Sequence, residues 1–172
     1  MDFEKLSAER YSLRKFSDRP VEAEKLAAVL EAGRNAPTAH NLQPQRIFVL
    51  QSPEALEKVD GCTGAHFHPP VMLLVAYDPA ASWKRETDGK DHGEIDAAIA
   101  ATQMMLEAVA QGLGTCWVGY FDPDQVRQAY ALPDDYIPVV ILTLGYPAAD
   151  AAPSPKHESR LAPEQTIFWE KF

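Results

Sequence analysis

Residues 71–77, VMLLVAY, decide the fold of this chain of 172 residues. The run follows the paired prolines Pro69 and Pro70 and is apolar throughout. Continuous apolar runs of this length are typical of strands that are buried on both faces. Residues 137–146, IPVVILTLGY, form a second run of the same kind. Because such strands need helices over both faces of their sheet, the sequence predicts an α+β fold with three layers, α/β/α, around a central mixed sheet.

Helical and strand patterns surround these two runs. The helical period is clear in residues 21–34, and Ser52 followed by Pro53 marks the start of a short helix. The longest helix is expected over residues 95–111, and Gly112 would end it. Its expected buried stripe consists of Ile95, Ile99, Met105 or Leu106, and Val109. Further helices are expected at residues 2–9 and 122–132, and further strands at residues 46–50 and 115–120.

The length and composition are those of one globular domain, residues 1–172, in which residues 150–172 form an extended C-terminal arm. Apolar residues make up 46% and charged residues 24% of the chain. The net charge of −9 argues against binding to nucleic acid or to anionic membranes, which it would repel. No apolar run is long enough to span a bilayer. The two cysteines form no CxxC pair, which indicates a reducing, cytoplasmic location.

The sharpest candidate for a binding cluster is the segment Arg10-Tyr11-Ser12-Leu13-Arg14. Two arginines four residues apart, with a hydroxyl between them, can converge on one phosphate, because each guanidinium group can donate two parallel hydrogen bonds to phosphate oxygens. A basic turn that is exposed to solvent at the end of a helix would have a similar sequence. The pattern therefore leaves both a phosphate site and a solvated turn open.

A second basic pair, Lys156 and Arg160, lies in the proline-bounded segment PSPKHESRL. If this segment returned to the N-terminal cluster, its charges would act on the same anion. A solvated linker is the alternative, and composition alone favours it.

Other chemistries find little support in the motifs. Residues 112–120, GLGTCWVGY, follow the order helix, glycine turn and strand, whereas a dinucleotide fingerprint needs strand, turn and helix. Cys62, His66 and His68 lack a fourth ligand at a zinc spacing, so no metal site is expected. Motifs of nucleophilic and metal hydrolases are also absent from the sequence. The sequence therefore predicts no conventional catalytic residue.

A stiff, amide-rich loop, NAPTAHNLQPQ at residues 35–45, separates a helix from a strand. Pro37 and Pro44 each fix their own φ angle and also restrict the conformation of the residue before them. Small residues would let this backbone approach a flat ring closely, and Asn41 could offer an amide to the polar edge of the ring. An ordinary turn is the alternative.

Together these segments resemble the FMN-dependent nitroreductase family, and the resemblance covers essentially the whole chain. ERYSLRKF is similar to the flavin phosphate motif of that family, and NAPTAHNLQP to its Ala-Pro-(Ser/Thr)-x-x-Asn-x-Gln-Pro loop. GLGTCWVGYFDP, ILTLGYP and PKHESRLAPEQTIFWEKF resemble later segments of the family in the same order.

The resemblance implies a nitroreductase-like fold and a homodimer with FMN sites at the subunit interface, where the C-terminal arm reaches the partner subunit. It implies three groups of cofactor-binding residues. These are Arg10, Tyr11, Ser12 and Arg14 with Lys156 and Arg160 around the phosphate and ribityl chain; Pro37, Thr38, Ala39 and Asn41 beside the flavin bound mainly by the partner; and Val118 and Gly119 along the isoalloxazine ring.

The resemblance also implies an activity: hydride passes from NADH or NADPH to flavin N5, and electrons then pass to a nitroaromatic, quinone or similar acceptor by a ping-pong mechanism. A specialised flavin reaction, such as reductive dehalogenation or flavin fragmentation, and a non-catalytic dimeric flavin-binding scaffold remain open. The chain departs from the family at Gln45, where tryptophan is frequent, and at Gly119, where larger members have an acidic residue. It largely lacks their insertion over the active site, and residues 83–91 are a candidate for a small lid.

Overall fold

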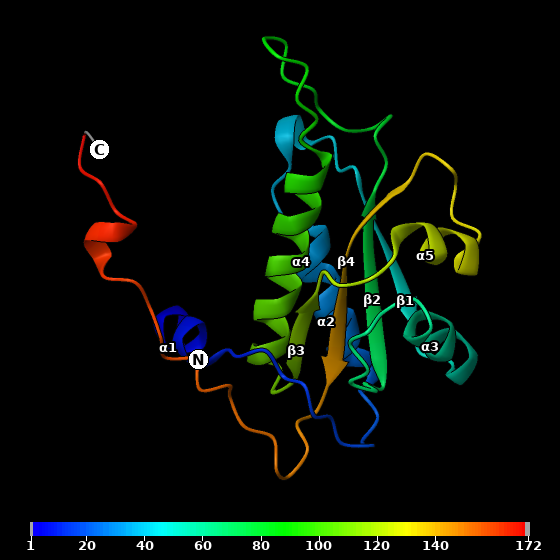
Figure 1. Ribbon diagram of the computed structural model, residues 1–172, viewed down its shortest axis with the longest axis vertical. Coiled ribbons are helices and arrows are strands. Elements are labelled where there is room, and N and C mark those ends of the chain that lie inside the picture. Colours follow the sequence, from blue (N-terminus) through cyan, green and yellow to red (C-terminus); the bar gives the residue numbers. More distant parts are fainter. Residues whose placement is uncertain (1, 171–172) are drawn as a thin grey trace.

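The computed structural model describes residues 2–170 and contains a four-stranded sheet with helices on both faces (Figure 1). The strands are β1 (Gln45–Leu50), β2 (Val71–Tyr77), β3 (Gly114–Val118) and β4 (Ile137–Gly145), in the spatial order β1-β2-β4-β3. One face is covered by α2 (Ala23–Arg34) and α4 (Gly93–Ala110), and the other by α3 (Pro53–Asp60) and α5 (Pro123–Tyr130). The predicted three-layer α+β fold is confirmed.

The direction of the strands differs from the expected mixed sheet. All three pairs of neighbouring strands are antiparallel. Within residues 2–170, parallel pairing occurs as one isolated bridge between Ser12 and Thr115. An apolar run reports burial on both faces and carries no information about strand direction, which explains the difference. Both expected central strands do lie in the centre of the sheet, and every residue of β2 is buried.

Helix boundaries follow the local capping signals. Asp2 accepts a hydrogen bond from the amide of Lys5 and so starts α1 (Phe3–Glu9). Ser52 accepts from the amide of Ala55 at the start of α3, as its sequence predicts. Gly112 lies just beyond α4 with a φ of 76°, a conformation that glycine adopts without strain.

The helix α4 buries the opposite face from the one expected. Ala97, Ala101, Met104 and Ala108 are buried against the sheet and α2, whereas Ile95 keeps 40% of its surface exposed. The reason is the close packing of the two helices, because a Cβ atom at Gly33 would lie 2.7 Å from Met104 Cγ. Of the expected stripe, Ile95, Ile99, Leu106 and Val109 lie outside the buried core, whereas Met105 is partly buried against it.

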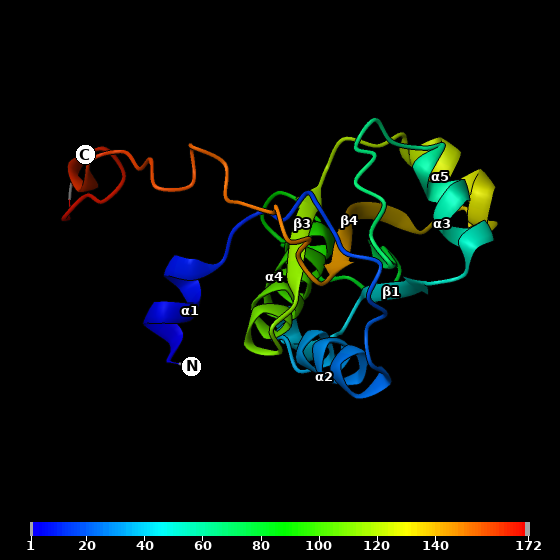
Figure 2. The same cartoon turned by 90° about the horizontal axis from the view of Figure 1, so that it is seen from below.

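The N-terminal segment and the C-terminal arm lie beside each other at one edge of the molecule (Figure 2). The amide of Ser17 donates to the carbonyl of Tyr146 at 2.9 Å, and the amide of Ala148 donates to the carbonyl of Lys15 at 3.1 Å. Lys15 Nζ also lies 2.5 Å from a carboxylate oxygen of Asp150. These contacts fasten the base of the arm, and the rest of the arm extends beyond α1 with a short 3-10 helix at Pro163–Gln165.

None of the helices within residues 2–170 is both long enough and apolar enough to cross a membrane.

Candidate functional site

The segment after α1 and the C-terminal arm together line a cavity of about 260 Å³. The predicted N-terminal cluster and the predicted arm pair both contribute to it. The lining residues, which we call the cradle, are Arg10, Tyr11, Ser12, Arg14, Ser154, Lys156, His157 and Arg160. The structure therefore brings Lys156 and Arg160 back to the N-terminal cluster, which favours an anion site over a solvated linker.

The charge of the cradle is positive and uncompensated. It holds three arginines and one lysine, and none of its lining residues is acidic. Within residues 2–170 none of these four cations forms an ion pair. Arg14 Nη1 donates to the carbonyl of Ser12 at 3.4 Å, and Arg160 donates to the carbonyl of Ser159 at 2.8 Å. The four like charges repel each other across one small cavity, and a bound phosphate would relieve that repulsion.

The edge strand β3 holds the N-terminal part of the cradle in place. The amide of Leu13 donates to the carbonyl of Thr115 at 2.8 Å, beside the bridge between Ser12 and Thr115. Burial raises the pKa of the neighbouring Cys116 thiol, while Arg14, Ser12 and Arg10 act on that pKa in the opposite direction. Cys116 is thus a buried residue of β3 beneath the cradle, as its place in an apolar strand predicts.

The loop of residues 35–45 is a strained structure. His40, Asn41 and Gln43 have φ values of 52°, 54° and 53°, in the left-handed region that costs a non-glycine residue roughly 1 kcal/mol or more. The amide of Gln43 donates to Thr38 Oγ1 at 3.1 Å, and the amide of Ala39 donates to Asp96 Oδ1 at 3.0 Å. Strain of this kind often occurs at functional sites, which makes the loop a candidate functional segment.

This loop lies far from the cradle within one chain. The loop contains a 3-10 turn at Ala39–Asn41, and Figure 1 shows that turn at the opposite end of α4 from α1. None of Pro37, Thr38, Ala39 or Asn41 lines the cradle. The two groups of predicted site residues could therefore act on one ligand only if two chains contributed to the same site.

Of the third predicted group, Val118 is the last residue of β3 and Gly119 follows it, next in the chain to Tyr120, which lines an open cleft of about 550 Å³. The cleft lies between residues 61–64 and 120–125. The amide of Asp122 donates to the carbonyl of Cys62 at 2.9 Å, and Thr63 Oγ1 donates to the carbonyl of Tyr120. A Cβ atom at Gly119 would meet no atom within 4 Å, so a flat ligand could approach the backbone there. Val118 itself is buried.

A sequence model of the Nitroreductase family matches residues 8–62 and 58–146 of the chain, which include the first cluster, the loop and β3. The chain belongs to the nitroreductase family. A solved nitroreductase family protein from Clostridium difficile 630 has a TM-score of 0.94 and 38% identity, with all of each chain covered.

Two curated relatives extend the comparison. A protein named NADH dehydrogenase from Thermus thermophilus is 29% identical, and the match covers 98% of this chain and 96% of the relative. A protein named FMN reductase [NAD(P)H] from Bacillus subtilis is 29% identical, with 84% of this chain and 66% of the relative covered.

Two members of the cradle in this nitroreductase family chain, Ser154 and His157, had no predicted role. Ser154 Oγ accepts from the amide of Lys156 at 3.3 Å, and the His157 ring meets the Tyr11 ring edge-on with 6.2 Å between centroids. Both residues flank Lys156 in PSPKHESRL, so only the return of the arm to the N-terminal cluster could have indicated them.

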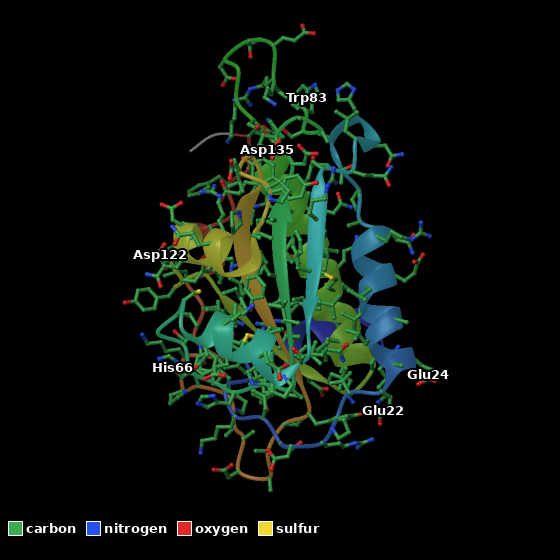
Figure 3. The ribbon with its side chains drawn as sticks, turned by 90° about the vertical axis from the view of Figure 1, so that its right-hand side faces the viewer. Glu22, Glu24, His66, Trp83, Asp122 and Asp135 are labelled. Carbon is green, nitrogen blue, oxygen red and sulfur yellow. The ribbon has the colours of Figure 1, made fainter. Side chains whose placement is uncertain are left out.

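Residues 83–91 project beyond the sheet as a loop whose two sides are joined by a bridge between Lys84 and Asp91 (Figure 1). Trp83 lies at its base (Figure 3), stacked on His40 with 5.3 Å between ring centroids. The Trp83 ring also meets the His92 ring edge-on at 4.7 Å. The projecting loop therefore contacts the strained loop of residues 35–45, and its action as a lid stays a prediction.

The two histidines that follow Cys62, His66 and His68, contact Asp60 and each other. His66 Nδ1 lies 2.9 Å from Asp60 Oδ2, and the His66 and His68 rings stack with 6.4 Å between centroids. Within residues 2–170 no group of three or more His, Cys, Asp or Glu side chains is arranged to hold a metal ion.

Proposed function

We propose that this chain is an FMN-dependent NAD(P)H oxidoreductase that acts as a homodimer of single-domain subunits. The observation that carries the proposal is the cradle, in which four cations from both ends of the chain meet around one small cavity with no carboxylate. Membership of the nitroreductase family supports it, as does the Bacillus subtilis relative named FMN reductase [NAD(P)H].

The cradle fits the phosphate of FMN in charge and in donor type. Arg10, Arg14 and Arg160 would donate paired N–H groups to its oxygens, Lys156 would add a further charge, and Ser12 a neutral hydrogen bond. Tyr11 would lie beside the ribityl chain. Bound FMN would supply the redox chemistry, taking hydride from NAD(P)H at N5 and passing electrons to the acceptor. The protein would bind and orient the ring, which explains why the sequence offers no conventional catalytic residue.

Dimerisation would complete this site. The loop residues Pro37, Thr38, Ala39 and Asn41 lie away from the cradle of their own chain, so they would reach the flavin held by the partner. The apolar stripe of α4 described above, with Ile95 40% exposed, gives the two chains a surface to share. Leu161, Ile167 and Trp169 of the arm are also more than half exposed, and a partner subunit would bury them.

The open cleft beside Gly119 suits a flat acceptor. Tyr120 and Phe121 line it, and aromatic rings favour stacked or edge-on contact with nitroaromatics and quinones. With one face of the flavin open, NAD(P)H and the acceptor would use the same space in turn, which gives ping-pong kinetics. A cytoplasmic location suits the free, buried thiols of Cys62 and Cys116.

The deciding experiment measures flavin content and its reduction. The purified protein is expected to be yellow, to release FMN on denaturation, and to be bleached by NADH or NADPH without oxygen. A quinone or nitroaromatic compound should then reoxidise the flavin. Steady-state turnover rates, measured against NAD(P)H at several fixed acceptor concentrations, should give parallel double-reciprocal plots. A protein that stays colourless in excess FMN would refute the proposal, and one that binds FMN without being bleached would be a flavin-binding scaffold.

A further inference from the structure

A buried carboxylate, Asp96, lies in the first turn of α4 directly behind the strained loop. Only 2% of its surface is exposed. Its Oδ1 accepts the hydrogen bond from the amide of Ala39 at 3.0 Å. Its Oδ2 is buried and has no hydrogen-bond partner within residues 2–170.

The helix dipole favours an acid in the first turn of α4, but that interaction does not require a buried carboxylate with an unpaired oxygen. Asp96 takes part in no ion pair within the described part of the chain. The charged group has lost much of its hydration, and one of its two oxygens gains no hydrogen bond in return. Apolar residues often replace buried charges without loss of stability, and alanine already occupies the neighbouring buried positions Ala97 and Ala100.

The loop, in contrast, needs an anchor at this point. Ala39 begins the 3-10 turn that contains His40 and Asn41, both in the left-handed region. Hydrogen bonds within the loop, such as that from the amide of Gln43 to Thr38, set its shape but not its position on the protein. The bond from Ala39 to Asp96 joins that turn to α4, the longest helix of the molecule.

We propose that Asp96 is a positioning residue for the flavin: it fixes the amide of Ala39 and thereby sets the distance of Pro37, Thr38 and Asn41 from the partner's FMN. This role rests on the proposed function. Asp96 does not touch the cofactor and acts through the loop backbone alone. The carboxylate, in which one oxygen accepts a hydrogen bond from Ala39 and the other has no partner within residues 2–170, thus serves to hold the loop in place.

The test compares Asp96→Ala, Asp96→Asn and the control Glu94→Ala, which removes an exposed acid from the same helical turn. The Ala variant loses the acceptor, whereas Asn keeps an oxygen in the place of Oδ1. FMN affinity is measured on the full-length dimer by flavin fluorescence, together with the visible spectrum of bound flavin and the melting temperature of the apo protein. Asp96→Ala should weaken FMN binding by about tenfold or more and shift the flavin spectrum, while Asp96→Asn and Glu94→Ala stay within about threefold of wild type.

A folded Asp96→Ala protein with wild-type FMN affinity and spectrum would overturn the assignment, and so would an Asp96→Asn protein as weak as Asp96→Ala. If Asp96→Ala does not fold, Ala39→Pro removes the same hydrogen bond from the loop side. Thr38 has φ −131° and ψ 156°, the extended conformation that proline requires before it. Wild-type FMN affinity in Ala39→Pro would then overturn the role. A wild-type protein that binds no FMN would instead refute the proposed function itself.

Discussion

The carboxylate of Glu22 accepts a hydrogen bond from the hydroxyl of Tyr146 at 2.7 Å, which joins the start of α2 to the end of the central strand β4. Arg19 pairs with the same carboxylate at 2.6 Å, and its guanidinium lies 3.8 Å from the centroid of the Tyr146 ring. Figure 3 shows Glu22 at the lower end of α2. The hydrogen bond from Tyr146, above all, lowers the pKa of Glu22 from 4.5 to about 2.

The lowered pKa of Glu22 predicts an acid-dependent contribution to stability. Since the folded pKa is about 2 and the ordinary value is 4.5, the contribution is complete above that ordinary value and disappears as the pH falls toward about 2. Glu22→Gln should therefore melt below wild type near neutral pH, and the difference should shrink to nothing at acid pH. Thermal melts of the apo protein over a pH series test this. Glu24→Gln is the control, because Glu24 is an exposed acid two residues further along the chain. A difference for Glu22→Gln that is constant with pH would contradict the explanation.

Removing Arg14 should weaken FMN binding far more than it lowers the stability of the apo protein. Arg14 is exposed and forms no ion pair within residues 2–170, so its loss breaks few contacts within the chain. A charged hydrogen bond to phosphate contributes about 1.5–3 kcal/mol, which predicts a loss of affinity of roughly tenfold to a hundredfold. FMN titration and apo melting curves measure the two effects. Arg34→Ala, which removes an exposed arginine that pairs with Glu31, should leave FMN affinity unchanged. Equal FMN affinity in Arg14→Ala would show that the phosphate lies elsewhere.

The sequence could predict the layers of the fold because strands that are buried on both faces are apolar at nearly every position. The predicted runs 71–77 and 137–146 contain the two central strands, and the helix predicted at 21–34 was found as α2, Ala23–Arg34, with Leu26, Val29 and Gly33 buried. The buried face of α4 could not be predicted in the same way. The apolar stripe that includes Ile95 and a stripe of alanines both repeat at the helical period, and only close packing with α2 decides that the smaller residues face inward.

The candidate site shows the same limit. The cluster around Arg10 is contiguous, so the sequence could mark it as a candidate anion site, although a solvated basic turn stayed open. That Lys156 and Arg160 join it depends on the path of the arm, which is fixed by contacts such as that between Lys15 and Asp150. Asp96 gave no signal at all, because a single acid near the start of a helix is common and its burial behind Ala39 is a property of the tertiary structure.

Replacing Gly93 by alanine should destabilise the fold. A Cβ atom at Gly93 would lie 2.1 Å from Cδ2 of Tyr77, a buried ring that cannot simply move aside. Overpacking of this kind costs about 1–3 kcal/mol, or roughly 2–10 °C in Tm for a chain of this size. Melting curves of the apo protein measure it. Gly61→Ala is the matched control, because a Cβ atom there would meet nothing closer than 3.5 Å at an ordinary φ of −68°. An unchanged Tm for Gly93→Ala would mean that Tyr77 has room to shift.

A charge on the outward stripe of α4 should separate the proposed dimer. Ile95 is 40% exposed in the single chain, so Ile95→Asp should leave the monomer folded while it places a carboxylate in an apolar interface. Sedimentation velocity should show a shift from dimer to monomer, and FMN retention should fall with it, since loop and cradle would no longer meet. Val49→Asp is the matched control, because Val49 is 39% exposed on the edge strand β1 and is not part of the apolar stripe of α4. A dimer that survives Ile95→Asp with its FMN would place the subunit interface on another surface.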